Sequence, residues 1–411
     1  MNKFRLILNE DTFLLVKNDD GLVYQSKNYR SFVFSISERL NEICRHLLVL
    51  EHLYTVELTE EDLNIPDVRF FLDNLLEIGA GRLIPSTKTK KGDVSLMPIL
   101  KIHEQVDYFN EKHKRGVGGR IIKHIHELTF YVTGSEYGND QYFRQTIFPT
   151  KSESILEKDK IIRFIRNTKN LFLSNINLVG NIFSYPKFEE LLREIEIFEV
   201  TVTFCITASD VLANKKLLEK TDWNDKTSFR ILMDKKDYIE PITAFFEYIK
   251  IPFSVDFIII SEQDYLDIEQ ISTTIKSNFV PMYNGENIDF FESNVFIRQE
   301  EILASALSKR QIFMRQATNI FYFGKLTVLP DGKVYADVNQ TPLGTIDDTV
   351  YSIVYKEFTE EKSWFRIRDF APCKDCVFQW LCPSPSNYEI AIGRNNLCHV
   401  KPKSNVFINV N

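Results

Sequence analysis

Residues 371–402 read APCKDCVFQWLCPSPSNYEIAIGRNNLCHVKP, a stretch that holds four of the six cysteines in the 411-residue chain. Their spacing is Cys373-x2-Cys376-x5-Cys382-x15-Cys398. A Cys-x2-Cys pair lets two thiolates point at one metal, and two further cysteines complete a four-thiolate site. Zinc and an iron–sulfur cluster both accept four thiolates, so the pattern predicts a metal centre of either kind.

The composition limits the class of protein. The chain is 44% hydrophobic and 13% aromatic, which is enough apolar content for a large core and two or three domains. A formal net charge of −7 argues against a nucleic-acid partner, which needs a basic protein surface. The sequence has no apolar run of about 18 residues and no secretory signal, so we expect a cytoplasmic protein with no membrane partner. Clustered cysteines in a reducing compartment are more often metal ligands than disulfides.

The first hundred residues predict a small α+β unit. The strand candidates are residues 4–9, 12–18, 22–28 and 30–36. Asp20-Gly21 predicts a hairpin turn between the second and third candidates. Ser37 is predicted to cap a helix that runs to about Leu53.

A second helical region follows that unit. Thr59 and Asp62 have the spacing of a capping box. The predicted apolar face consists of Val68, Phe71, Leu72, Leu75 and Leu76. Gly79 and Gly81 are predicted to end the helix, and residues 82–100 could form a wing. This order of elements is typical of a winged-helix domain.

Winged helices often bind DNA, and the basic cluster Lys88, Lys90 and Lys91 would suit that role. Residues 1–100 nevertheless carry 12 Lys and Arg against 15 Asp and Glu. The net negative charge of this unit disfavours DNA binding.

From about residue 120 the sequence alternates between strand and helix patterns. The strand candidates are residues 127–133, 171–179, 199–206, 228–234, 252–260 and 278–284. Six β/α units in succession predict parallel pairing with right-handed crossovers, and therefore an α/β fold with a partial (β/α)6 barrel. Active sites of such barrels lie at the carboxyl ends of the strands. The loop after the first strand, residues 134–152, contains no cysteine, and Cys44 and Cys205 are interpreted as core residues.

The last hundred residues begin with a predicted β-hairpin around Asp331-Gly332. The hairpin, the Cys-x2-Cys-x5-Cys motif and the distant fourth cysteine together resemble the SPASM domain of peptide-modifying radical SAM enzymes. That domain normally holds two auxiliary 4Fe-4S clusters. The ligands of the second of these clusters would be Cys373, Cys376, Cys382 and Cys398. Two cysteine positions of the other cluster hold Asp337 and Ser386, so the resemblance implies that one cluster is kept and one is lost.

The central units would then be the counterpart of a radical SAM barrel. Radical SAM enzymes bind the cluster that cleaves S-adenosylmethionine through a Cys-x3-Cys-x2-Cys motif after the first strand, and this motif is absent. The Gly-Gly-Glu-Pro element that ends the second strand is replaced by Val179-Gly180-Asn181-Ile182. The resemblance therefore implies a pseudoenzyme that does not cleave S-adenosylmethionine.

The N-terminal unit resembles the winged-helix element with which many such enzymes bind a leader peptide. The physical mode would be β-augmentation, in which the leader adds a strand to an exposed sheet edge. The alternative is a packing module without a ligand.

Taken whole, the chain resembles the pseudo-radical-SAM, SPASM-containing proteins of ribosomal peptide maturation in Bacteroidetes. The expected domains are a winged-helix-like peptide recognition domain (1–100), a degenerate radical SAM-like barrel (118–310) and a SPASM-like iron–sulfur domain (311–411). The implied function is that of a non-catalytic accessory with one 4Fe-4S cluster, which binds the precursor leader peptide, an active radical SAM maturase, or both. Phe378 and Trp380 would exclude water from the cluster.

Two alternatives belong to other classes. The first is an enzyme that uses the barrel cavity for acid/base chemistry, with candidate residues His124, His126, Glu136, Asp140 and Arg144. The second is a peptide-binding protein stapled by zinc, in which His399 is a further candidate ligand. Metal analysis separates the zinc alternative from an iron–sulfur protein.

Overall fold

The computed structural model describes residues 3–88, 94–95, 117–233, 236–269, 276–360 and 363–400. The strands are β1 (Lys3–Leu8), β2 (Thr12–Lys17), β3 (Asp20–Gln25), β4 (Arg30–Ser35), β5 (Thr55–Thr59), β6 (Gly81–Pro85), β7 (Glu127–Tyr131), β8 (Asn175–Val179), β9 (Thr201–Thr207), β10 (Thr227–Met233), β11 (Phe253–Ile259), β12 (Ser277–Pro281), β13 (Lys325–Val328), β14 (Lys333–Tyr335) and β15 (Gly344–Thr345). The α-helices are α1 (Glu38–Leu48), α2 (Glu60–Asn64), α3 (Pro66–Glu77), α5 (Lys158–Thr168), α6 (Phe188–Glu196), α7 (Ala208–Ala213), α8 (Lys215–Lys220), α9 (Ile239–Ile249), α10 (Glu262–Glu269), α11 (Ile288–Asn294), α12 (Gln299–Ala304), α13 (Lys309–Ala317), α14 (Val350–Glu360) and α15 (Asn387–Ile392).

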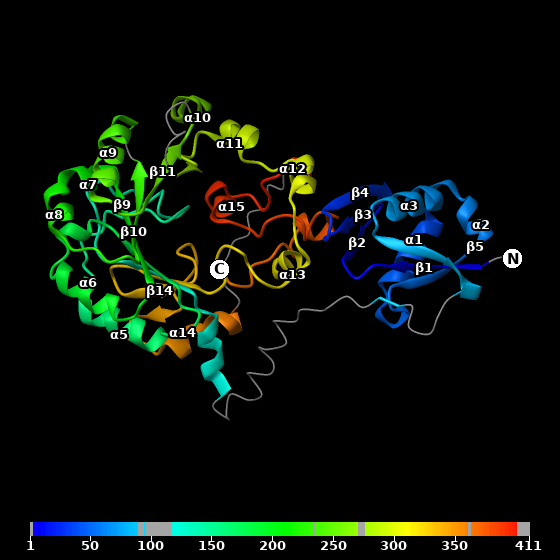
Figure 1. The fold of residues 1–411 in the computed structure, drawn as a ribbon, viewed down its shortest axis with the longest axis horizontal. Coiled ribbons are helices and arrows are strands. Elements are labelled where there is room, and N and C mark those ends of the chain that lie inside the picture. Colours follow the sequence, from blue (N-terminus) through cyan, green and yellow to red (C-terminus); the bar gives the residue numbers. More distant parts are fainter. Residues whose placement is uncertain are drawn as a thin grey trace.

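The central sheet has nine strands in the order β12-β11-β10-β9-β8-β7-β13-β14-β15. Strands β7 to β12 are parallel neighbours in chain order, and all six strands predicted for this region are present. Helices α5 to α10 lie on the outer side of this sheet (Figure 1). The predicted mixed α/β architecture with a mostly parallel central sheet is confirmed, whereas a barrel of the radical SAM type stays a prediction.

The two faces of the central sheet differ because polar and apolar residues alternate along its strands. In β7, Leu128 and Phe130 belong to the apolar core that the outer helices cover, while Glu127 and Thr129 do not. The same alternation recurs in β8, where the core residues Ile176 and Leu178 are flanked by asparagines. The face of the sheet opposite the helices is therefore polar at Glu127, Thr129 and the two asparagines. A separate apolar cluster that includes Tyr131, Val179 and Cys205 covers the carboxyl ends of these strands.

The hairpin predicted around Asp331-Gly332 is present as β13 and β14. Gly332 has a φ of +81°, a left-handed conformation that glycine adopts without steric cost. Strand β13 also pairs in parallel with β7, which the sequence pattern did not indicate. One sheet therefore crosses the predicted domain boundary between residues 310 and 311.

The N-terminal unit contains two three-stranded sheets, β5-β1-β6 and β2-β3-β4, together with α1, α2 and α3. The four predicted strands of residues 4–36 are present, and the capping box of Thr59 and Asp62 forms at the start of α2. Whether this arrangement is a winged helix stays a prediction. Lys90, Lys91 and most of the predicted wing lie outside the described residues.

The predicted turn at Asp20-Gly21 is displaced by two residues. Lys17 pairs with Asp20, so the turn consists of Asn18 and Asp19, and Asn18 has a φ of +53°. Asparagine tolerates this left-handed conformation because its short polar side chain bonds locally. Gly21 lies inside β3, where an added Cβ would come within 2.2 Å of the Phe34 ring. Glycine is needed here because it has no side chain to collide with that ring.

The predicted helix end at Leu53 and the predicted apolar position of Leu76 are both wrong. Helix α1 ends at Leu48, and the chain then turns through Leu53 (φ +51°). Ser37 precedes α1 but makes no side-chain capping bond. Leu76 is 40% exposed, since the core covers only the stripe of α3 that includes Phe71 and Leu75.

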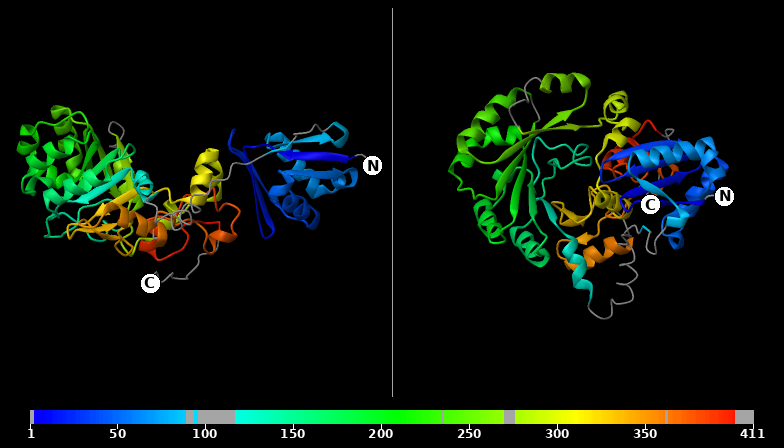
Figure 2. Two further views of the ribbon diagram at one scale, coloured as in Figure 1. Left: turned by 90° about the horizontal axis from the view of Figure 1, so that it is seen from below. Right: turned by 45° about the vertical axis from the view of Figure 1, so that its right-hand side comes forward.

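The N-terminal unit and the central sheet lie at opposite ends of the molecule, with the C-terminal segment between them (Figure 2). Side chains of β2 and β3, including Phe13 and Tyr24, pack against α13 and residues 376–381. The Tyr24 hydroxyl, which is fully buried, accepts a hydrogen bond from Leu307 N at 2.7 Å and donates to Leu307 O at 3.0 Å. Within the described part of the chain, no helix has the length and apolar character needed to cross a membrane.

Candidate metal centre

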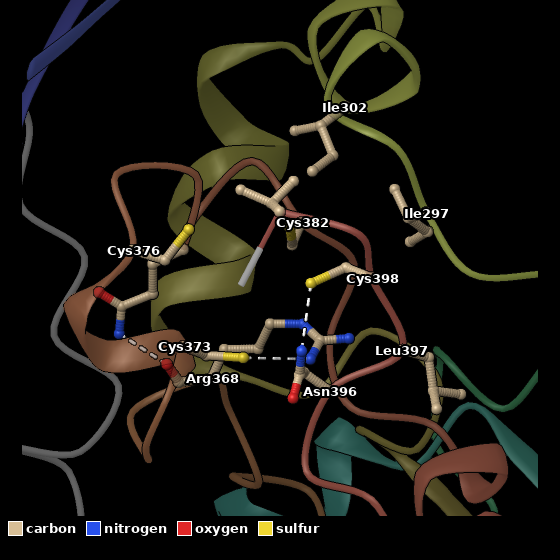
Figure 3. Close-up of a pocket in the computed structure, with 11 residues that line it drawn as sticks. Ile297, Ile302, Arg368, Cys373, Cys376, Cys382, Asn396, Leu397 and Cys398 are labelled. Carbon is tan, nitrogen blue, oxygen red and sulfur yellow. Dashed lines mark hydrogen bonds between the residues drawn. The ribbon is translucent and has the colours of Figure 1, made fainter. Parts of the chain in front are cut away.

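The four cysteines of the C-terminal motif surround one pocket, although they span 26 residues of sequence. Figure 3 shows them around this space, which we call the cysteine pocket. Its lining residues are Ile297, Ile302, Arg368, Cys373, Cys376, Gln379, Cys382, Asn396, Leu397, Cys398 and Val400. The structure thus brings together all four predicted ligands.

Tight backbone turns place the first three cysteines. Cys376 N donates to Cys373 O at 3.0 Å, and Cys382 N donates to Phe378 O at 2.9 Å. The fourth cysteine comes from a different segment. It lies in a short parallel bridge with Ile297, in which Ile297 N donates to Leu397 O at 3.0 Å.

Most of the cysteine pocket is shielded from water. Cys373 and Cys376 are 7% and 6% exposed, whereas Cys382 and Cys398 are half-buried. Phe378 is buried in the apolar cluster that joins this loop to β2 and β3, and Trp380 packs against the same cluster. Both aromatic residues therefore lie where they would limit the access of water to the sulfur atoms.

Two buried N–H donors point at the sulfur atoms. Arg368 Nη1 donates to Cys373 Sγ at 3.6 Å, and Asn396 Nδ2 donates to Cys398 Sγ at 3.3 Å. The pKa of the Cys373 thiol is raised by burial, and burial raises the pKa of Cys382 to about 12. The positive charge of Arg368 opposes both shifts without reversing them. Because a thiolate is the form that binds metal, metal binding here would release protons.

The chemistry of the ligands admits two kinds of metal centre. The four cysteines line a common pocket. Four thiolates hold either a single zinc ion or a polynuclear iron–sulfur centre with one thiolate per iron. His399 lies outside the pocket lining, and its Nε2 is 2.8 Å from Glu292 O.

Asp337 and Ser386, the two positions without cysteine, lie near each other and contact one arginine. Arg366 Nη2 is 3.5 Å from Asp337 Oδ2 and donates to Ser386 O at 3.3 Å. Asp337 is only 2% exposed, and burial raises the pKa of its carboxyl, with the Arg366 charge opposing that shift. A guanidinium group therefore connects the two positions.

Glu389 links this region to the cysteine pocket. Its Oε2 accepts hydrogen bonds from the amide and hydroxyl of Ser386 in the capping box of α15. Its Oε1 accepts from Arg368 Nη2 at 2.9 Å, and Arg368 in turn donates to Cys373. Two arginines of one short segment thus serve different regions: Arg366 contacts Asp337 and Ser386, and Arg368 contacts the cysteine pocket.

The segments that follow β7 and β8 are the ones that would hold a reactive cluster and S-adenosylmethionine in the resemblance stated above. The loop after β7 contains no cysteine, and Asn181 follows β8 with its Oδ1 buried and without a hydrogen-bond partner. Gly180 has a φ of +115°, and an added Cβ would lie 1.9 Å from Thr133 O. Glycine at this position allows the ends of β7 and β8 to approach each other.

The residues of the acid/base alternative do not converge on a cavity. Glu136, Asp140 and Arg144 are exposed. His124 packs against Phe323 and Phe358, and burial lowers its pKa, while His126 Nε2 is 2.9 Å from Phe323 O. None of these five candidates lines the cavity on the polar face of the central sheet.

That cavity, of about 250 Å³, is the feature that sequence reasoning missed. Its lining includes Glu127, Arg230 and Lys325, and Arg230 is paired with the fully buried Asp256. A hydrogen-bonded network covers the adjoining strands, with Asn177 Nδ2 donating to Thr129 Oγ1 at 3.0 Å. The sequence signal that could have indicated this polar sheet face is the alternation of polar and apolar residues in ELTFY (127–131) and NINLV (175–179).

No protein-family model matches the sequence, and no curated protein sequence matches it. Twelve chains of solved structures match in a comparison of structures. The crystal structure of Streptococcus suis SuiB bound to precursor peptide SuiA is 12% identical, with a TM-score of 0.42, covering 95% of this chain and 97% of that chain.

SuiB bound to S-adenosylmethionine gives 12% identity and a TM-score of 0.41, covering 93% of this chain and 96% of that chain. A histidine-tagged anSMEcpe with bound AdoMet gives 15% identity and a TM-score of 0.41, covering 62% of this chain and 87% of that chain.

Proposed function

We propose that this protein is a non-catalytic accessory of a ribosomal peptide maturation system. It binds the leader of a precursor peptide, an active radical SAM maturase, or both, and it carries one 4Fe-4S cluster on Cys373, Cys376, Cys382 and Cys398. The observation that carries the proposal is the convergence of these four cysteines on one largely buried pocket. The pocket would supply four thiolates and leave no iron open to substrate.

The non-catalytic part of the proposal is supported by the absence of cysteine from residues 134–152, the loop that would carry the reactive cluster. Asn181 stands where the resemblance places a carboxylate for S-adenosylmethionine. A protein without these groups lacks the three-cysteine motif after β7 through which an electron would reach the sulfonium.

Peptide binding is supported by the free edge of β4. Within the described residues, β4 pairs only with β3. Ile36 N donates to Asp19 O at 2.9 Å, so the next pair, Asp20 and Ser35, is not hydrogen-bonded. Hydrogen-bonded and non-hydrogen-bonded pairs alternate along antiparallel strands, so Ser31 also belongs to a non-hydrogen-bonded pair. The N–H and C=O of Ser31 therefore point away from β3 and could bond to an added strand.

An apolar contact adjoins this edge. Phe70 of α3 is 52% exposed, and its ring lies 6.4 Å from the ring of the half-buried Phe32 on β4. An extended peptide on β4 would place alternate side chains against these two rings. Main-chain hydrogen bonds with two or three apolar anchors would give low-micromolar affinity, equivalent to about −8 kcal/mol.

The cluster is tested by anaerobic purification and reconstitution of the full chain, followed by iron, sulfide and zinc analysis. We expect four irons and four sulfides per chain, as one 4Fe-4S cluster contains, and the triple replacement of Cys373, Cys376 and Cys382 by Ala should abolish both. Cys205→Ala, a buried cysteine outside the pocket, is the matched control. Stoichiometric zinc without iron would sink the cluster assignment.

The pseudoenzyme is tested by incubating the reconstituted protein with S-adenosylmethionine and dithionite. We expect no 5′-deoxyadenosine above a protein-free control. Turnover proportional to protein concentration, after removal of contaminating enzymes, would overturn this part of the proposal.

Peptide binding is tested by titrating a labelled leader from a neighbouring precursor gene against the full chain. Ser31→Pro removes the outward N–H and should weaken binding at least about tenfold, while Ser31→Ala keeps that N–H and should bind like the parent. Equal affinity for a scrambled leader would remove specific recognition. If the protein does not associate with the maturase encoded by a neighbouring gene, with or without peptide, the proposed binding to a maturase is wrong.

A further inference from the structure

Two buried side chains donate hydrogen bonds to sulfur atoms of the cysteine pocket. Arg368 is 7% exposed and reaches Cys373 Sγ with Nη1, while its Nη2 bonds to Glu389 at 2.9 Å and its Nε bonds to Pro383 O. These bonds fix the guanidinium plane. One edge of a buried cation is therefore held against a sulfur atom.

Asn396 supplies the second donor. It is 2% exposed, and its Nδ2 donates to Cys398 Sγ at 3.3 Å, while its Oδ1 is buried without a hydrogen-bond partner. Leaving a buried carbonyl oxygen unpaired costs about 1–3 kcal/mol. That cost is offset only if the amide donor faces a strong acceptor, and a charged sulfur is a stronger acceptor than a neutral thiol.

A further cation approaches from α13. Arg315 is half-buried and donates to Leu381 O, one residue before Cys382. None of the ion pairs between residues that the structure describes includes Arg315. Its guanidinium therefore fixes the backbone of the turn that carries Cys382.

Such an environment acts on the charge of the bound group. Four thiolates on a 4Fe-4S cluster give a net negative charge, and that charge grows by one unit when the cluster takes up an electron. Buried N–H donors and cations stabilise the more negative state more strongly, because the surrounding dielectric is low. Hydrogen bonds to the sulfur atoms therefore raise the reduction potential.

We infer that Arg368 and Asn396 are positioning residues that raise the reduction potential of the cluster, so that it takes up and releases one electron reversibly. The inference rests on the proposed iron–sulfur function and goes beyond it by assigning the residues that set the potential. The electron would come from an external one-electron donor, for which dithionite stands in below, and no bond forms or breaks in the protein. Cys382 and Cys398 are half-buried, so they mark the side by which the electron would enter.

The test is a dye-mediated redox titration of the reconstituted full chain, followed by electron paramagnetic resonance. Asn396→Leu removes one donor while leaving the Arg368 ion pair intact, and Arg368→Gln removes the buried charge. Each change should lower the equilibrium constant for one-electron reduction about tenfold, a shift of about 59 mV to lower potential. Iron and sulfide content should stay at the level of the parent protein.

Lys374→Gln is the matched control, because Lys374 is adjacent to Cys373 but exposed. Water and salt screen an exposed charge, so this variant should keep the parent potential. If the Arg368→Gln variant does not bind the cluster, the reduction potential of Asn396→Leu alone tests the inference.

Iron-loaded Asn396→Leu with the parent potential would overturn the inference, as would an equal shift in Lys374→Gln. Absence of iron from the parent protein would instead overturn the proposed function on which the inference rests.

Discussion

The cysteine pocket and the region around Asp337 and Ser386 lie on either side of one short segment, yet they are held together by different chemistry. On one side, Arg368 directs an N–H at a sulfur atom beside a pocket. On the other side, Arg366 approaches a buried carboxylate and a main-chain carbonyl directly. The first arrangement directs a donor at sulfur, and the second pairs a buried carboxylate with a cation.

Distant segments of this chain are therefore held together in two chemically different ways. An inorganic cluster contributes free energy by binding several deprotonated ligands at once. A buried ion pair contributes far less net free energy, because removing the charges from water costs nearly as much as their attraction returns. The cysteine pocket should therefore depend on its group more strongly than the other region depends on Arg366.

The largest effect should come from removing one ligand of the cysteine pocket. Cys376→Ala should abolish the cluster and unfold residues 371–400, since a structural metal contributes on the order of 10 kcal/mol in small sites. Hydrogen exchange of this segment, together with the melting temperature, measures the loss. Cys44→Ala, which removes a buried sulfur from the N-terminal core, should cost on the order of 1 kcal/mol. Unchanged melting of the Cys376 variant would show that the metal is not structural.

A smaller effect should follow from breaking the ion pair in the other region. Arg366→Met leaves the Asp337 carboxylate buried without its cation and should lower the free energy of unfolding by about 3 kcal/mol. Urea unfolding followed by tryptophan fluorescence measures this change, and the fully buried Trp364 is a nearby reporter. Arg163→Met, which breaks an exposed pair with Asp347, should change the free energy of unfolding far less, because water and salt screen that pair. Equal losses in the two variants would contradict the contrast between buried and exposed pairs.

The smallest effect should be a pH dependence that belongs to Asp337. Burial raises the pKa of its carboxyl, so the folded state holds the proton more tightly than the unfolded chain. The resulting stability is fully present below the unfolded pKa of about 3.9 and is lost as pH rises through the raised folded pKa. Asp337→Asn binds no proton, so its free energy of unfolding relative to the parent should increase as pH rises above the unfolded pKa of about 3.9.

Asp347→Asn provides the matched control with the opposite sign. The hydrogen bond from Lys160 lowers the pKa of Asp347, so its contribution is present above the unfolded pKa and is lost as pH falls. Parallel pH profiles for the Asp337 and Asp347 variants would contradict the assignment of a raised pKa to Asp337.

Much of the local structure could be predicted because it depends on neighbours in the sequence. The capping box of Thr59 and Asp62 and the hairpin at Gly332 follow from side chains and dihedral angles within four residues. The strands of the central sheet follow from runs of alternating polarity. The turn at Asn18 was misplaced because Asp20-Gly21 has an equally good turn signal, and only the Phe34 ring across the sheet requires glycine inside the strand.

The α/β alternation, the parallel order of β7 to β12 and the set of four candidate cysteines could be read from the sequence, because each depends on periodicity or short spacing. Three features appear only in the folded chain: β13 joins β7, β2 and β3 pack beside the cysteine pocket, and Arg368 and Asn396 face its sulfur atoms. These contacts join residues whose separation in sequence varies from two to several hundred. No local pattern encodes them, because they form only when the packing of the whole chain brings buried donors and acceptors within hydrogen-bond distance.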